Sequence, residues 1–166
     1  TRPDVDAARI VVQGRSWSGY WAAKLAHTER ARLRGAVVHG GPVHGYFQPD
    51  WLPRSLASDE YLYDYSQATS ALFGATTMEG LLERARTFSL LDSGLLNQPS
   101  APMLLVNGAR DSQIPIADVF VLLGHGDAKE AWVNPAGGHM GRSPEWPANA
   151  IFEKVVMPWM LRRLQS

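Results

Sequence analysis

Three polar residues of this sequence have the types and the chain order of a nucleophilic catalytic unit. Ser16 lies in the segment G-R-S-W-S, Asp111 follows an apolar segment, and His139 lies in a glycine-rich loop. In such a unit the imidazole takes the proton of the serine hydroxyl, while the carboxylate holds the imidazole tautomer and stabilises the imidazolium. The residues therefore predict attack of Ser16 on a carbonyl carbon, with His139 as the base and Asp111 as the acid.

The residues around Ser16 predict a strand, a tight turn and a helix. The β-branched run at 10–12 indicates a buried strand, and residues 21–26 are typical of a helix. A serine presented on such a turn needs small residues two positions before it and two positions after it. Gly14 meets this need, and Ser18 stands where glycine is usual.

The same turn supplies a hydrogen-bond donor for a developing negative charge. The backbone N–H of Trp17 would lie at the start of the helix, where an N–H has no partner within the helix. One such donor contributes on the order of 3 kcal/mol when it binds an oxyanion. We therefore expect the N–H of Trp17 to form part of an oxyanion hole.

Four short apolar segments predict a parallel sheet. They lie at about residues 9–13, 35–39, 102–107 and 130–133. Ser16, Asp111 and His139 each follow one of these segments, and α/β sheets gather functional groups at the carboxyl ends of their strands. The sequence thus predicts an α/β protein with a mostly parallel sheet flanked by helices, in one domain that covers residues 1–166.

The chain resembles the carboxyl-terminal half of an α/β-hydrolase in three motifs, G-R-S-W-S-G at 14–19, V-N-G-A-R-D at 106–111 and G-G-H-M at 137–140. It is most similar to the group that holds the fermentation-respiration-switch esterases, 2,6-dihydroxypseudooxynicotine hydrolase and the fungal polyketide-shortening hydrolases. This resemblance implies hydrolysis of an ester, or cleavage of a carbon–carbon bond next to a ketone. It implies a small-molecule acyl or aromatic ketone substrate and no cofactor.

The position of Ser16 predicts an incomplete fold. An α/β-hydrolase places several strands and a second oxyanion donor before this turn, whereas Ser16 lies almost at the amino terminus of this chain. The strand at 9–13 would normally be central, and as an edge it would expose unpaired backbone groups. We expect a fragment, a nicked product or a subunit, with the missing strands supplied by the amino-terminal half of the same protein or by a second chain, which includes a homo-oligomer.

The segment between the second and third strands, at about 42–100, predicts crossover helices with a cap-like helical insertion. It is rich in aromatic residues, namely Tyr46, Phe47, Trp51, Tyr61, Tyr63, Tyr65, Phe73 and Phe88. Residues 76–86 predict a helix with Thr76 or Thr77 as its N-cap, and Glu79 is placed for a capping box with Thr76. The tyrosines either line an aromatic acyl pocket or pack the helices over the sheet.

The other four histidines have weaker claims to a catalytic role. His39 and His44 flank a glycine-proline turn after the second strand and, with Tyr46, are candidates for a substrate pocket; the alternative is a structural role. His27 is expected to be a solvent-facing or helix C-terminal residue, and His125 to lie in a surface turn. The histidine spacings do not match a metal-binding helix face, so we expect no metal.

Three other aspartates are rivals for the role of the acid. Asp118 is expected in a helix begun by Pro115, and both Asp92 and Asp127 in turns. Farther along, residues 148–164 predict an amphipathic helix that Pro158 kinks or restarts.

Composition excludes several classes of protein. The 166 residues are 45% apolar and carry 16 basic and 16 acidic side chains, which gives no basic patch for nucleic acid and suits a chain with a cytoplasmic location by default. No apolar run reaches the roughly 18 residues of a membrane span. The absence of cysteine excludes disulfides and thiolate sites.

The alternative to a serine hydrolase is a catalytically idle module of the same fold that binds a small molecule or a partner.

Overall fold

The computed structural model describes residues 3–58, 64–127 and 129–165, and its strands form one parallel sheet. In sheet order they are β1 (Val11–Arg15), β2 (Gly35–His39), β3 (Met103–Gly108) and β4 (Glu130–Asn134). Each neighbouring pair runs parallel. The predicted α/β class with a parallel sheet is therefore confirmed, and the four strands lie within two residues of their expected bounds.

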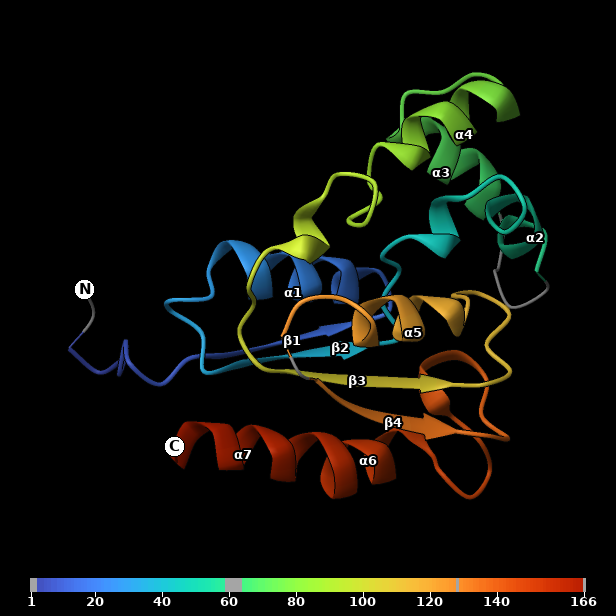
Figure 1. The fold of residues 1–166 in the computed structure, drawn as a ribbon. Helices are drawn as coiled ribbons and strands as arrows, with labels where there is room; N and C mark the ends of the chain where they lie inside the picture. Colours follow the sequence, from blue (N-terminus) through green and yellow to red (C-terminus); the bar gives the residue numbers. More distant parts are fainter. Residues whose placement is uncertain (1–2, 59–63, 128, 166) are drawn as a thin grey trace.

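Helices cover both faces of the sheet (Figure 1). One face carries α1 (Trp17–Thr28) and α5 (Ala117–Leu123), and the other carries α6 (Ala148–Ile151), the π-helix η4 (Phe152–Val156) and α7 (Met157–Gln165). Pro158 is the second residue of α7, so it begins the second half of this helical segment as predicted. Proline has no amide hydrogen and crowds the preceding turn, which suits the wider π turn before it.

The chain between β2 and β3 forms short helices above the α1 face (Figure 1). These are η1 (Gly45–Phe47), α2 (Leu52–Leu56), α3 (Tyr65–Leu72), α4 (Met78–Arg86) and η2 (Leu95–Asn97). Thr77 caps α4, because its hydroxyl accepts the N–H of Gly80 at 3.1 Å. The alternative cap, Thr76, is thus not used. Tyr61 and Tyr63 lie outside the described residues.

The core lies on both sides of the sheet. Ala36 and Val38 of β2 pack under α1, whereas Val37 between them packs against Trp159 of α7. Successive side chains of a strand point to opposite faces, so a strand covered on both sides must be apolar at every position. This double covering explains the short continuous apolar runs in the sequence.

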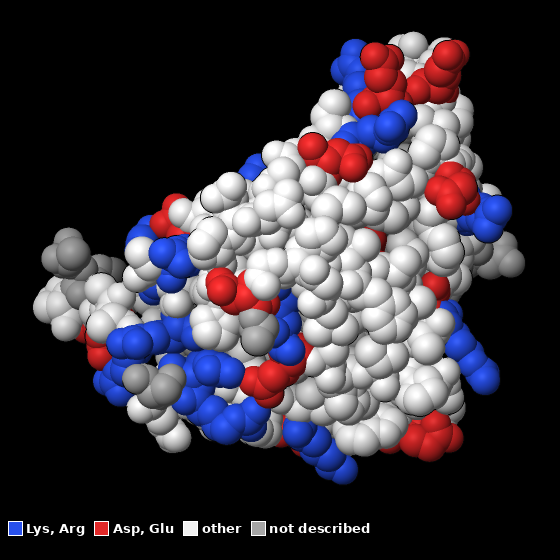
Figure 2. Space-filling view, viewed as in Figure 1, with Lys and Arg blue, Asp and Glu red and all other residues white. Residues whose placement is uncertain are grey.

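Charged side chains are unevenly spread over the face shown in Figure 2. Lys and Arg gather toward the amino ends of the strands and the end of α7, where Arg162 and Arg163 lie in the last turn. Uncharged side chains cover most of the centre of this face. Two loop segments, η3 (His139–Gly141) and the loop after β3, lie at the opposite edge of the sheet, where the strands have their carboxyl ends.

Glycine residues let α1 start directly at the end of β1. A Cβ on Gly14 would lie 2.0 Å from the carbonyl oxygen of Ser18, and one on Gly19 would lie 2.5 Å from the Cα of Gly41. Because the turn is a single residue long, α1 begins at Trp17 and not near residue 21 as expected. The close backbone contact fixes the position of the intervening serine.

Replacement of Gly14 tests this close contact. We expect Gly14→Ala to lower the free energy of unfolding by about 2 kcal/mol or more, because the added methyl group overlaps backbone atoms that cannot move aside. The matched control is Gly124→Ala at the end of α5, where the nearest atom to a new Cβ lies at 3.4 Å. Urea unfolding of the natural chain and of the two variants measures the loss of stability in each variant. Equal stability of Gly14→Ala and Gly124→Ala would show that the contact is not required.

Candidate active site

Ser16 lies in a strained turn between β1 and α1. Its φ is 53° and its ψ is −130°, and among the described residues other than glycine only Met140 shares a positive φ. The N–H of Ser16 donates to the carbonyl oxygen of His39 at 2.8 Å, which ties the turn to β2. Such a conformation costs on the order of 1–3 kcal/mol and persists only where its surroundings enforce it.

Ser18, which stands where glycine is usual, takes part in this turn. The hydroxyl of Ser18 accepts the N–H of Arg15 at 2.7 Å and donates to the carbonyl oxygen of the same residue at 2.7 Å. Both peptide groups of Arg15 point away from β2, because the neighbouring Ser16 N–H points toward it. The substitution of serine for glycine therefore satisfies backbone groups at the open edge of the sheet.

The structure brings the three predicted catalytic residues into one chain of hydrogen bonds. Ser16 Oγ lies 2.8 Å from His139 Nε2, and His139 Nδ1 lies 2.9 Å from Asp111 Oδ2. The other carboxylate oxygen of Asp111 accepts the N–H groups of Gln113 and Ile114 at 2.8 and 3.0 Å. The side chains of Asp111 and His139 are 0% and 4% exposed, so the bond between them is shielded from water, whereas Ser16 is half-buried.

This arrangement defines the imidazole tautomer that nucleophilic catalysis needs. A carboxylate only accepts, so Nδ1 of His139 carries the proton and Nε2 is left to accept from the hydroxyl of Ser16. The N–H of Trp17, the first residue of α1, has no hydrogen-bond partner within the described residues. It is free to donate to an oxyanion formed at Ser16.

The three candidate pocket residues make structural contacts. His39 is buried with Nε2 at 2.8 Å from the carbonyl oxygen of Met140, and His44 Nδ1 lies 2.8 Å from the hydroxyl of Ser89. Tyr46 is fully buried, and its ring lies edge-on to that of Trp17 with centroids 5.3 Å apart. Contact of these residues with substrate stays a prediction.

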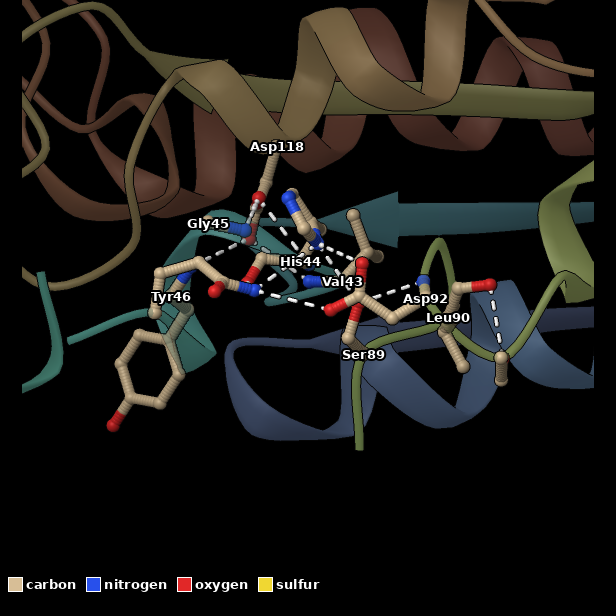
Figure 3. A network of polar contacts seen from close by, with 10 residues as sticks. Val43, His44, Gly45, Tyr46, Ser89, Leu90, Asp92 and Asp118 are labelled. Carbon is tan, nitrogen blue, oxygen red and sulfur yellow. Dashed lines mark hydrogen bonds and ion pairs between the residues drawn. The ribbon is translucent and has the colours of Figure 1, made fainter. Parts of the chain in front are cut away.

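A buried carboxylate holds the loop that carries His44 and Tyr46 (Figure 3). Asp118 of α5 is 1% exposed and accepts the backbone N–H groups of Val43, His44, Gly45 and Tyr46. Burial raises the pKa of this carboxyl, and the backbone donors oppose that shift. Asp118 lies in a helix as predicted, but its structural role was missed because the sequence gives no signal of a loop that folds onto it.

Aromatic side chains lie around Trp17, the residue that follows Ser16. A cavity of about 650 Å³ is lined mainly by aromatic rings, among them Trp17, Tyr20, Trp21, Phe73 and Phe88. A smaller cavity of about 200 Å³ lies on the α3 side of Trp17. The indole N–H of Trp17 donates to the hydroxyl of a residue of α3, Tyr65, at 2.8 Å.

The remaining histidines and rival acids lie away from the three residues. His27 lies in the last turn of α1, one of the two places expected for it, but it is buried, with Nδ1 3.0 Å from the carbonyl oxygen of Gln98, because this turn packs against the chain before β3. Asp127 accepts the N–H of Ser100, and Asp92 accepts from the side chain of Gln48. His125 is half-buried, with Nδ1 on the carbonyl oxygen of Val121.

Neither a metal-binding group nor a membrane-spanning helix is found in the described ranges. Residues 3–58, 64–127 and 129–165 hold no group of three or more His, Asp or Glu side chains that is arranged to bind a metal ion. Within the same ranges, no helix has the length and apolar character needed to cross a membrane.

Comparison with solved structures identifies the fold as an incomplete α/β-hydrolase fold. The chain superposes on 2,6-dihydroxy-pseudo-oxynicotine hydrolase with a TM-score of 0.73 at 20% identity, over 98% of this chain and 42% of that one. It matches acetyl xylan esterase 1 from Thermoanaerobacterium sp. JW/SL YS485 with a TM-score of 0.62 at 21% identity, over 98% and 48% of the two chains. It matches an acylaminoacyl peptidase with a TM-score of 0.65 at 21% identity, over 98% and 25%.

The chain thus spans less than half the length of each of these three proteins. Neither a protein-family model nor a curated protein sequence matches it. The expected α/β-hydrolase fold with part of its sheet absent is therefore confirmed.

The buried His39 makes stability sensitive to acid. Burial lowers the pKa of His39 from 6.5 to about 4; the hydrogen bond to the Met140 backbone opposes this shift, and the charges of Arg15, His139 and Arg142 add to it. Above pH 6.5 the ring is neutral in both the folded and unfolded states; below it the unfolded chain binds a proton that the folded chain refuses until about pH 4. We expect the free energy of unfolding to fall across this window by up to about 3 kcal/mol.

Urea unfolding at pH 7.5 and pH 4.5 measures this loss. The neutral variant His39→Gln should lose markedly less stability than the natural chain between the two pH values, whereas the control His125→Gln should lose as much. The difference between chains isolates His39 from His27, whose pKa burial also lowers. The same loss in His39→Gln as in the natural chain would contradict the assignment.

Proposed function

We propose that this chain carries the nucleophile, base and acid of a serine hydrolase. The observation that supports the proposal is the chain of hydrogen bonds from the buried Asp111 through the buried His139 to Ser16. The three named structural neighbours are a hydrolase, an esterase and a peptidase. All three names describe addition of water across a bond, the chemistry that this arrangement can perform.

The proposed reaction proceeds through an acyl-enzyme. His139 Nε2 takes the proton of Ser16 as Oγ forms a bond to the substrate carbonyl carbon, and the N–H of Trp17 donates to the resulting oxyanion. Collapse of this intermediate breaks the bond to the leaving group, which collects the proton from His139. A water molecule then attacks the acyl group with His139 again as base, and the acid and free Ser16 are released. Asp111 stabilises the imidazolium in both halves.

We propose an ester, or a carbon–carbon bond next to a ketone, as the bond that is cleaved. Both reactions begin with attack of Ser16 on a carbonyl and differ in the atom that His139 protonates, an oxygen in the alcohol or a carbon in the ketone product. The aromatic lining of the cavity beside Trp17 supports an acyl or ketone substrate that carries an aromatic ring.

We also propose that a further strand completes the enzyme by pairing with β1. β1 lies at the edge of the sheet, and the N–H groups of Val11 and Gln13, which point away from β2, have no partner within the described residues. Such an edge readily accepts another strand. It would come from the amino-terminal half of the same protein or from a second chain, another copy of this chain included.

Replacement of Ser16 tests the hydrolase proposal. We expect a fluorophosphonate to add one phosphonyl group to Ser16, and Ser16→Ala to lower the hydrolysis of p-nitrophenyl acetate, or of an aryl 1,3-diketone, about 10⁴-fold or more. The control Ser93→Ala, a serine whose hydroxyl donates to the carbonyl oxygen of Leu90, should keep the natural rate. Intact mass and steady-state rates are the measurements. Retained turnover in Ser16→Ala would exclude the triad.

Hydrogen–deuterium exchange tests the strand that is proposed to join β1. In the reactive protein as isolated we expect the amide of Gln13 to be protected, and native mass spectrometry to show a second polypeptide or a second copy of this chain. After the two are separated, the amide of Gln13 should exchange faster, while that of Val37 in the inner strand β2 stays protected. Full reactivity in a single chain with a rapidly exchanging Gln13 would contradict the proposal.

A further inference from the structure

Met140, the residue after His139, has a backbone conformation that residues other than glycine rarely adopt. Its φ is 60° and its ψ is 23°, in the left-handed region. Its side chain packs on Gly40, where a Cβ would lie 2.8 Å from the Cγ of Met140. Conformations of this kind persist only where neighbouring groups enforce them. The groups that hold Met140 therefore also decide where the adjacent His139 lies.

Two buried side chains bind the peptide groups of Met140. Nε2 of His39, at the end of β2, lies 2.8 Å from the carbonyl oxygen of Met140, and Oδ1 of Asn107, in β3, accepts its N–H at 3.0 Å. His39 and Asn107 are 2% and 1% exposed. The two inner strands thus supply one hydrogen bond each to the residue that follows His139.

The contact with Met140 defines the state of His39. A carbonyl oxygen only accepts, so Nε2 of His39 carries the proton and the ring donates. Nδ1 of His39 is buried and has no partner within the described residues. The low pKa of His39, about 4 because of burial, keeps the ring neutral and in this donor form near neutral pH.

We propose that His39 and Asn107 are positioning residues that hold the Met140 peptide and thereby keep the imidazole of His139 in line between Ser16 and Asp111. The inference rests on the proposed role of His139 as the base. His39 and Asn107 have no hydrogen bond to any of the three side chains within the described residues, so they act through the backbone. A turn of the Met140 peptide would move the imidazole away from partners that lie only 2.8 and 2.9 Å from its nitrogens.

A pair of variants at His39 tests the proposal. The amide nitrogen of glutamine can reach the place of Nε2, whereas that of asparagine reaches only the place of Nδ1. We expect His39→Asn to lower the rate of fluorophosphonate labelling at saturating reagent by about 10- to 100-fold, with the half-saturating concentration unchanged, because a displaced base slows only the chemical step. His39→Gln should recover most of the rate.

A second readout does not depend on turnover. The proton shared by His139 Nδ1 and Asp111 should give a low-field NMR resonance that is lost or broadened in His39→Asn and present in His39→Gln. If the natural chain is not labelled at all, the proposed hydrolase function fails, and this resonance still decides whether His39 positions His139.

The control is His27→Gln, which withdraws the nitrogen at the place of Nδ1 from another buried histidine, whose Nδ1 lies on the carbonyl oxygen of Gln98 at the far end of α1. It should leave the labelling rate unchanged. Asn107→Ser, which withdraws the acceptor from the Met140 N–H, should show the same losses as His39→Asn and keeps the test open if one variant does not fold. The natural rate and resonance in folded His39→Asn, or an equal loss in His27→Gln, would overturn the proposal.

Discussion

The close approach of α1 to the end of β1 is the constraint on which the rest of the site depends. Gly14 allows the backbone of the strand to meet that of Ser18 in the helix where a methyl group would not fit, and Gly19 likewise lets α1 approach Gly41 after β2. This contact leaves room for a single residue in the turn, so Ser16 must take a positive φ. The same contact places the N–H of Trp17 at the start of a helix, next to the serine hydroxyl. A nucleophile and a donor for its oxyanion are thus consequences of one packing contact.

Strain at two positions is balanced by hydrogen bonds from the inner strands. Ser16 and Met140 both have a positive φ. The backbone of Ser16 is tied to the carbonyl oxygen of His39, and that of Met140 to the side chains of His39 and Asn107. One residue at the end of β2 therefore contacts both strained turns. The nucleophile and the base lie on different loops, and β2 links the two directly.

Much of the fold could be predicted because it follows from patterns among residues that are close in sequence. The apolar segments between turns predicted the positions of the four strands. The chain order of Ser16, Asp111 and His139 predicted which loops at the carboxyl ends of these strands come together. The start of α1 was placed too late, because the sequence does not show that the turn is one residue long. The burial of His27 was missed as well, since it depends on the segment before β3 that packs against the end of α1.

The sequence by itself determined the types of group at the site and the edge of the sheet at which they lie. Strand periodicity and small residues at fixed spacing act over a few neighbouring positions, so they can be read without a structure. Only the tertiary structure decided the contacts of His39, Asn107 and Asp118. Each of them binds backbone groups that are distant in sequence, Met140 for the first two and Val43 to Tyr46 for the third. Such partners are chosen by the packing of loops against the sheet, where a buried polar group must find a hydrogen bond or destabilise the fold.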